Sequence, residues 1–188
     1  MQKVEHIKAN QYASSACSSL HIYVLDESRF GLHAVHRRCL TARGIKPVVT
    51  HQHRFQNFYL FGAYAPLSGD QFTLEMPGCD TECFQAYLDR FSLHKPQQFK
   101  LIILDNGAFH KAARLCIPPN TALLFLPPYA PELNPAEMIW RYIKDRIANR
   151  AFDSLKHMAD AVAAIVQNLS ATTIQSITGW KLYTHCIV

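Results

Sequence analysis

Several features that mark other protein classes are missing from this chain of 188 residues. No apolar run approaches the roughly 20 residues needed to cross a bilayer, and the N-terminal stretch MQKVEHIKANQY lacks the apolar core of a signal peptide. No internal repeat or low-complexity tract is present. These absences argue against membrane, secreted and repeat proteins, and we expect a cytoplasmic protein with no membrane partner.

The six cysteines show no spacing that suggests a shared role. Only Cys79 and Cys83 lie close together, and there is no CxxC pair. Neither a zinc site nor a disulfide framework is therefore indicated, and reduced thiols are expected. With 49% hydrophobic and 18% charged residues, the composition is that of an ordinary globular protein of one domain.

Acidic residues are absent from one long stretch, between Arg29 and Arg54. Six basic residues give this stretch a charge of +6. Because the net charge of the whole chain is +5, the remainder of the chain is nearly balanced. Clustered Lys and Arg attract phosphates, which makes a polyanion a plausible partner; a solvated hairpin is the alternative. The candidate DNA-binding residues in the stretch are Arg37, Arg38, Arg43, Lys46 and Arg54.

Apolar runs and helical spacing predict a mixed α/β fold. Strands are expected at residues 21–25, 54–64, 71–76, 99–104 and 121–126, the first three as an antiparallel meander. Asp80 is a good N-cap for a helix that ends near Leu93, and Asn134 followed by Pro135 opens another, with isoleucines at positions 139, 143 and 147 as its buried stripe. Further helices are expected at about 153–169 and 172–179.

Three carboxylates stand at the ends of these elements. Asp26 follows the strand HIYVL, Asp105 follows FKLIIL, and Glu137 lies in the first turn of the helix that begins NPAEMIW. Hard oxygen ligands on rigid elements suit magnesium, and two ions about 4 Å apart can activate a nucleophile and stabilise a leaving oxygen. We expect Asp26 to be shared between the ions, with Asp105 and Glu137 completing one coordination sphere each.

Each carboxylate also has a structural interpretation. An Asp at the end of a strand often only forms a turn, which applies to Asp26 and Asp105 taken singly. Asn134 and Glu137 have the spacing of a capping box at a helix start. Glu27 is a neighbouring candidate ligand, but its position one residue further along the strand indicates that it faces elsewhere.

The segment LFLPPYAPELNPAEMIW, with LDNGAFH and LDES before it, resembles the catalytic domain of the DDE superfamily endonucleases. More narrowly, it resembles bacterial insertion-sequence transposases related to the mariner elements, including the 31 residues between Asp105 and Glu137. The resemblance covers about Leu25 to Arg150.

This resemblance implies a ribonuclease H-like fold and a catalytic triad of Asp26, Asp105 and Glu137. It also implies two Mg²⁺ ions, which Mn²⁺ can replace, and cut-and-paste transposition on double-stranded DNA, at transposon ends and target, in association with the bacterial nucleoid. His110 falls where such transposases often have histidine, so it is expected either to contact the scissile phosphate or to orient Asp105. Arg141 and Lys144, one and two helical turns after Glu137, are further candidates for DNA contact, with solvated helix charges as the alternative.

Residues 1–20 depart from the family pattern, because complete transposases of this type carry helix-turn-helix modules before the first catalytic Asp. We therefore expect residues 1–20 to be a loosely ordered linker remnant and residues 21–188 to be the catalytic domain. An upstream reading-frame product would supply the helix-turn-helix domain, and a homodimer is possible. The competing functions are a non-catalytic DNA-binding or regulatory remnant and a ribonuclease, which the segment PPYAPELNP disfavours.

Overall fold

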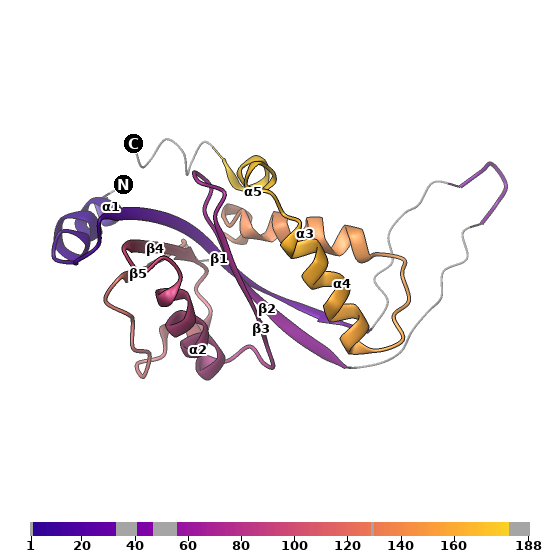
Figure 1. Cartoon of the computed structure of the whole chain (residues 1–188), viewed down its shortest axis with the longest axis horizontal. Coiled ribbons are helices and arrows are strands. Elements are labelled where there is room, and N and C mark those ends of the chain that lie inside the picture. The colour runs from indigo at the N-terminus through magenta and orange to yellow at the C-terminus, as the bar shows by residue number, and fades with distance from the viewer. Residues whose placement is uncertain (1, 33–40, 47–55, 129, 181–188) are drawn as a thin grey trace.

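The computed structural model describes residues 2–32, 41–46, 56–128 and 130–180. These residues form a mixed five-stranded sheet, in the order β3-β2-β1-β4-β5, with helices on both faces (Figure 1). The strands are β1 (Ser19–Gly31), β2 (Asn57–Tyr64), β3 (Gln71–Met76), β4 (Gln98–Leu104) and β5 (Thr121–Phe125). The α-helices are α1 (Gln2–Ile7), α2 (Thr81–Leu93), α3 (Ala136–Ile147), α4 (Leu155–Gln167) and α5 (Ala171–Thr178).

The long strand β1 lies at the centre of the sheet and changes partner along its length. It pairs in parallel with β4 from Ser19 to Val24, and antiparallel with β2 from Val24 to Gly31. The predicted meander of β1, β2 and β3 is confirmed, and β4 and β5 follow as parallel strands. Past Val24, no strand of the described residues pairs with the β4 side of β1.

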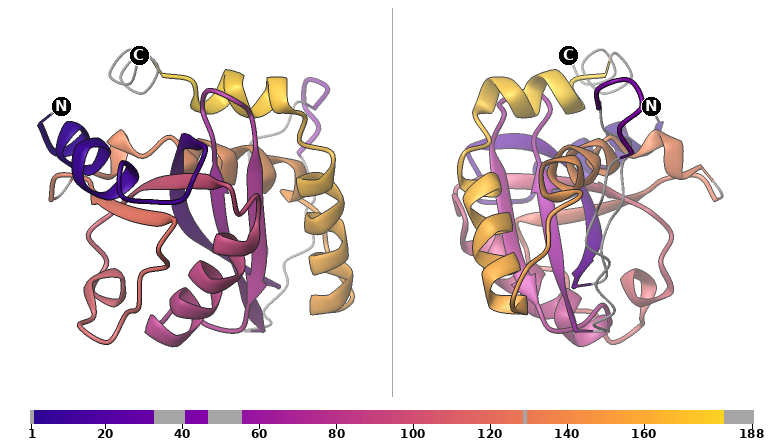
Figure 2. Two further views of the ribbon diagram at one scale, coloured as in Figure 1. Left: turned by 60° about the vertical axis from the view of Figure 1, so that its left-hand side comes forward. Right: turned by 90° about the vertical axis from the view of Figure 1, so that its right-hand side faces the viewer.

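Alternate residues of β1 feed two separate cores, as the two-residue period of a strand requires. Ile22 and Val24 pack in the core that contains the buried residues of α3 and α4, whereas Tyr23 and Leu25 pack in the core of α2. Figure 2 shows α2 on one side of the sheet and α4 and α5 on the other. Residues after Leu25 continue this alternation, which decides the face on which each later side chain lies.

The two helices that carry sequence signals form as expected. The Asp80 carboxylate accepts a hydrogen bond of 2.8 Å from the Cys83 N–H and so caps α2. Along α3, Ile139, Ile143 and Ile147 are all buried and form the predicted apolar stripe. Both helices are thus held by one apolar face against the sheet. Among the described residues, no helix is long and apolar enough to cross a membrane.

Two elements differ from the sequence-based expectation. Residues 2–12, expected to be loosely ordered, form α1 and a π-helical turn (Lys8–Tyr12). Ile7 is buried there, and the Tyr12 ring packs against Phe99 with centroids 5.7 Å apart. Strand β1 runs to Gly31 instead of ending before Asp26, because β2 continues to pair with it. Both differences arise from contacts with residues far away in the chain.

Candidate active site

Asp26 lies inside β1, two residues beyond the last pair with β4, on the face covered by α3. The indole N–H of Trp140 in α3 donates a hydrogen bond of 2.9 Å to Asp26 Oδ2. Burial and the nearby carboxylates of Glu27, Glu137 and Asp105 raise the pKa of Asp26 to about 8. Asp26 is therefore held in place by an indole and exposed to an excess of negative charge.

Asp105 immediately follows β4, and its side chain is 53% exposed. Its Oδ1 atom accepts a hydrogen bond of 2.9 Å from the Gly107 N–H and lies 2.9 Å from His110 Nδ1. The contact with His110, helped by the Gly107 N–H and Lys111, lowers the pKa of Asp105 despite its partial burial. Asp105 is thus an ionised carboxylate held through one oxygen.

Glu137 is exposed in the first turn of α3. Partial burial and the carboxylates of Asp105 and Glu132 raise the pKa of Glu137. Asn134 already satisfies the helix start: its Oδ1 accepts from the Ala136 N–H at 3.1 Å, and its Nδ2 donates to the Leu25 carbonyl at 2.9 Å. The Glu137 N–H donates to the backbone carbonyl of Asn134 rather than to its side chain, and among the described hydrogen bonds the Glu137 carboxylate accepts none from the Asn134 N–H. Neither side-chain bond of a capping box is therefore present.

The three carboxylates come from β1, the end of β4 and the start of α3, and they act on one another electrostatically. Asp105 and Glu137 both contribute to the raised pKa of Asp26, and Asp105 contributes to that of Glu137. Within the described part of the chain, however, no three His, Cys, Asp or Glu side chains are close enough together to hold a metal ion. That these carboxylates share metal ions therefore stays a prediction.

His110 is 2% exposed, in the short 3-10 helix Ala108–Lys111 that follows Asp105. Its Nε2 lies 3.0 Å from Glu27 Oε1, so its two ring nitrogens face two carboxylates. Burial disfavours the imidazolium, but Asp105 and Glu27 outweigh this and raise the pKa of His110 to about 9. This burial favours the orienting role for His110 over contact with a scissile phosphate. Glu27 faces away from Asp26, as expected.

The predicted basic surface lies partly outside the described residues. This applies to Arg37, Arg38 and Arg54, whereas Arg43 and Lys46 are exposed in the described segment 41–46. The role of these residues in binding DNA remains a prediction.

The two basic residues of α3 that follow Glu137 differ in their surroundings. Arg141 is exposed, and its Nε lies 3.9 Å from the Asp145 carboxylate, a weak pair on one helix face. The Lys144 ammonium lies over the Phe30 ring at 5.5 Å from its centroid. Arg141 is therefore the more accessible of the two to a phosphate, although neither the contact of Arg141 nor that of Lys144 prevents phosphate binding.

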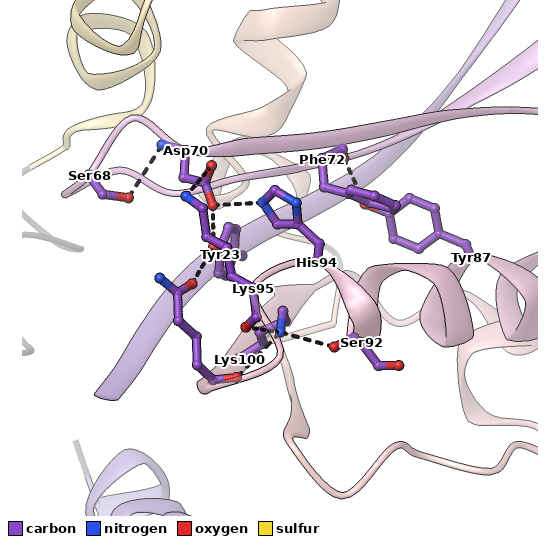
Figure 3. Close-up of polar contacts among 10 residues, drawn as sticks. Tyr23, Ser68, Asp70, Phe72, Tyr87, Ser92, His94, Lys95 and Lys100 are labelled. Carbon is purple, nitrogen blue, oxygen red and sulfur yellow. Dashed lines mark hydrogen bonds and ion pairs between the residues drawn. The ribbon is translucent and has the colours of Figure 1, made fainter. Parts of the chain in front are cut away.

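A polar cluster that sequence analysis missed lies at the other end of α2 (Figure 3). The Asp70 carboxylate accepts a 2.6 Å hydrogen bond from Tyr23 Oη, and lies 3.0 Å from His94 Nε2 and 2.7 Å from Lys95 Nζ. The buried Lys100 ammonium donates to three carbonyl oxygens, among them that of Lys95, where the chain leaves α2. These contacts tie α2 to the sheet. The contacts of Asp70 with Tyr23 and His94 could not be predicted from a local pattern, because these residues are distant in sequence.

A groove elsewhere on the molecule does not contain the carboxylates. A groove of about 1130 Å³ follows the edge strand β5 and is lined by residues of the segments 11–17, 92–99 and 110–125. Asp26, Asp105 and Glu137 lie outside it. The three carboxylates therefore do not belong to this groove.

Comparison with known proteins shows the family and the fold of this chain. The family model of the DDE superfamily endonucleases matches residues 21–159. A protein of Sinorhizobium fredii (strain NBRC 101917 / NGR234), y4pE/y4sA, described as uncharacterized, is 38% identical over 96 residues, which cover 50% of this chain and 71% of that protein.

Among solved structures, the Mos1 mariner paired-end complex with Mn is similar with a TM-score of 0.69 and 16% identity, over 97% of this chain and 58% of that one. A pre-cleavage Mos1 transpososome is similar with a TM-score of 0.69 and 14% identity, over 99% and 58%. The chain thus spans a little over half the length of the Mos1 chains that it matches. Its mixed sheet with flanking helices is the predicted ribonuclease H-like fold, and the chain belongs to the DDE superfamily of endonucleases.

Proposed function

We propose that this chain is the catalytic domain of a DNA transposase, which hydrolyses phosphodiester bonds at transposon ends and joins the freed strands to target DNA. Asp26, Asp105 and Glu137 are its catalytic residues. The observation that carries the proposal is the place of Asp26 near Glu137 and Asp105: burial first, and then the carboxylates of Glu27, Glu137 and Asp105, raise the pKa of Asp26 to about 8. A bound cation would stabilise the ionised form of such a carboxylate.

The donor chemistry of these residues suits a pair of Mg²⁺ ions, for which Mn²⁺ can substitute, once the side chains converge. All three side chains offer hard oxygen donors, and a divalent cation would offset the repulsion that raises the pKa of Asp26. When bound, the two ions would supply an activated water or hydroxyl and a stabilised leaving oxygen. In this proposal Asp26 is the shared ligand, oriented by the Trp140 indole, and Asp105 and Glu137 complete one sphere each.

Double-stranded DNA is the proposed substrate, at transposon ends and at the target. Similar Mos1 structures are described as complexes with a left transposon end and as a strand transfer complex. The basic stretch from Arg29 to Arg54 would hold the phosphate backbone, and Arg141 and Lys144 would grip it beside Glu137. We further propose that an upstream reading-frame product with a helix-turn-helix domain selects the transposon ends, and that the active form is a homodimer.

A nicking assay on a supercoiled plasmid that carries the element's ends tests the proposal. The chain is assayed with Mg²⁺ or Mn²⁺, with and without the upstream product. Wild type should nick the plasmid, whereas Asp105→Asn and Glu137→Gln should not. Glu132→Gln is the matched control, because Glu132 is an exposed carboxylate close to Glu137 that is assigned no metal.

One alternative function remains within the same fold: a non-catalytic remnant that binds DNA or regulates a complete transposase. A wild-type chain that binds the plasmid but leaves it intact under every one of these conditions would establish that alternative and refute the catalytic proposal.

A further inference from the structure

Glu27 and His110 form a buried pair directly behind two of the candidate catalytic carboxylates. Glu27 follows Asp26 in β1, but strand alternation turns it to the opposite face of the sheet, toward α2. The Glu27 side chain is 8% exposed and that of His110 is 1% exposed, and Glu27 Oε1 lies 3.0 Å from His110 Nε2. The pair therefore joins the segment that carries Asp26 to the segment that carries Asp105.

The His110 ring is held rigidly in this position. It packs against Phe84 of α2, with centroids 4.5 Å apart, and against Phe109, with centroids 4.0 Å apart. With Nε2 in contact with Glu27, the other nitrogen, Nδ1, lies 2.9 Å from Asp105 Oδ1 and forms an ion pair with it when the ring is protonated. The orientation of the ring is thus set by packing and by Glu27 together.

Asp105 meets this ring through a single oxygen. Its contacts with the Gly107 N–H and with His110 Nδ1 both use Oδ1, while the side chain remains 53% exposed. Gly107 leaves no spare room: a Cβ atom there would lie 2.9 Å from His110 Nδ1 and 3.2 Å from Asp105 Oδ1. The geometry thus restrains the Asp105 carboxylate through Oδ1 while the side chain stays half exposed.

We propose that Glu27 and His110 are a positioning pair: Glu27 fixes His110, and His110 fixes the Asp105 carboxylate for metal binding. This inference rests on the proposed metal-dependent function. Neither residue is a catalytic residue in this account, because Glu27 lies on the face away from Asp26 and His110 is enclosed by aromatic rings. Partners behind a metal ligand commonly orient it, and their loss typically weakens metal binding by about 10-fold to 100-fold.

The test measures Mn²⁺ binding by calorimetry without DNA, together with cleavage and urea unfolding. Glu27→Ala and His110→Ala should each weaken Mn²⁺ binding by about 10-fold to 100-fold. Glu27→Gln should restore most of the affinity, because an amide oxygen can still accept from His110 Nε2. In an Asp105→Asn background, Glu27→Ala should cause no further loss. Glu82→Ala is the matched control, since Glu82 is an exposed carboxylate paired with Arg114 at 2.6 Å.

The outcomes separate this inference from the function on which it rests. If wild type neither binds Mn²⁺ nor cuts DNA, the proposed function falls, and the positioning pair with it. If wild type binds Mn²⁺ and the two alanine variants bind it equally well, only the positioning pair is overturned. If Glu27→Gln binds as poorly as Glu27→Ala, or if the loss persists in the Asp105→Asn background, Glu27 acts on the metal by itself and the inference is wrong. Because Glu27→Gln conserves shape, it keeps the test decisive even where an alanine variant unfolds.

Discussion

Replacing Asp26 by Asn should make the metal-free protein more stable near neutral pH while abolishing cleavage. The amide oxygen of Asn can still accept the hydrogen bond from the Trp140 indole, so the packing of α3 on β1 is kept. What the substitution removes is an ionisable group whose charged form is opposed by burial and by three neighbouring carboxylates, so that the folded protein must hold it protonated. The prediction therefore isolates the electrostatic cost of the site from its shape.

The size and sign of the effect follow from the shift in the pKa of Asp26 from 3.8 to about 8 on folding. Between these values the unfolded chain binds fewer protons than the folded one, so the stability of wild type falls as the pH rises. At about 1.36 kcal/mol per pKa unit, the loss approaches about 4 kcal/mol at pH 7 and vanishes below pH 4. Asp26→Asn should exceed wild type by up to this amount at pH 7 and equal it at pH 4.

Urea unfolding with a chelator present, at several values of pH, measures the difference. Asp70→Asn is the control, because the same substitution should act in the opposite direction. Burial opposes the charge of Asp70, but contacts with Lys95, Tyr23 and His94 outweigh it and lower the pKa of Asp70 to about 2. The charge of Asp70 therefore stabilises the fold above pH 4, and its removal should destabilise the protein at pH 7. An Asp26→Asn protein no more stable than wild type at pH 7, with Asp70→Asn behaving as expected, would refute the reasoning.

Three further predictions concern the third carboxylate, the basic stretch and the sheet beside Asp26. Glu137→Gln should abolish cleavage yet change the free energy of unfolding by less than about 1 kcal/mol in urea, whereas a variant that still cuts would make Glu137 a helix residue only. Arg37→Glu with Arg38→Glu should weaken DNA binding and flatten its dependence on salt, measured by fluorescence anisotropy; an unchanged slope would leave a solvated segment. Gly62→Ala should destabilise the protein by about 1 to 3 kcal/mol in urea unfolding, because the new Cβ would lie 2.7 Å from the Trp140 ring; wild-type stability would contradict this packing.

Local signals in the sequence were enough to predict the elements that depend on residues close together in the chain. The Asp80 cap and the isoleucine stripe of α3 were predicted because a cap and a helical period are each contained within a few residues. The three candidate carboxylates were recognised because two of them follow apolar runs of the sequence and the third lies at the start of a helix. Their assignment as metal ligands remains a prediction, since it depends on side-chain positions that spacing cannot provide.

The contact between Glu27 and His110 could not be predicted from the spacing of residues in the sequence. Each residue was noticed separately, one as a spare ligand and the other as a contact for phosphate or for Asp105. Their contact joins residues 83 positions apart, and it depends on which face of β1 each side chain takes once β2 has extended the strand. A pattern within one element predicts the direction of a side chain, but its partner comes from another element.

The change of partner along β1 also determines when the site can come into existence. The hydrogen bond between Trp140 and Asp26 spans 114 residues, and that between Asn134 and the Leu25 carbonyl spans 109. Contacts of such long range form late, because the entropy of closing the loop is lost before they are made. During synthesis, Asp26 and Asp105 emerge long before Glu137, and a chain interrupted before α3 holds an incomplete set of carboxylates. In the proposed function, an unfinished polypeptide that lacks Glu137 would therefore be unable to cut DNA.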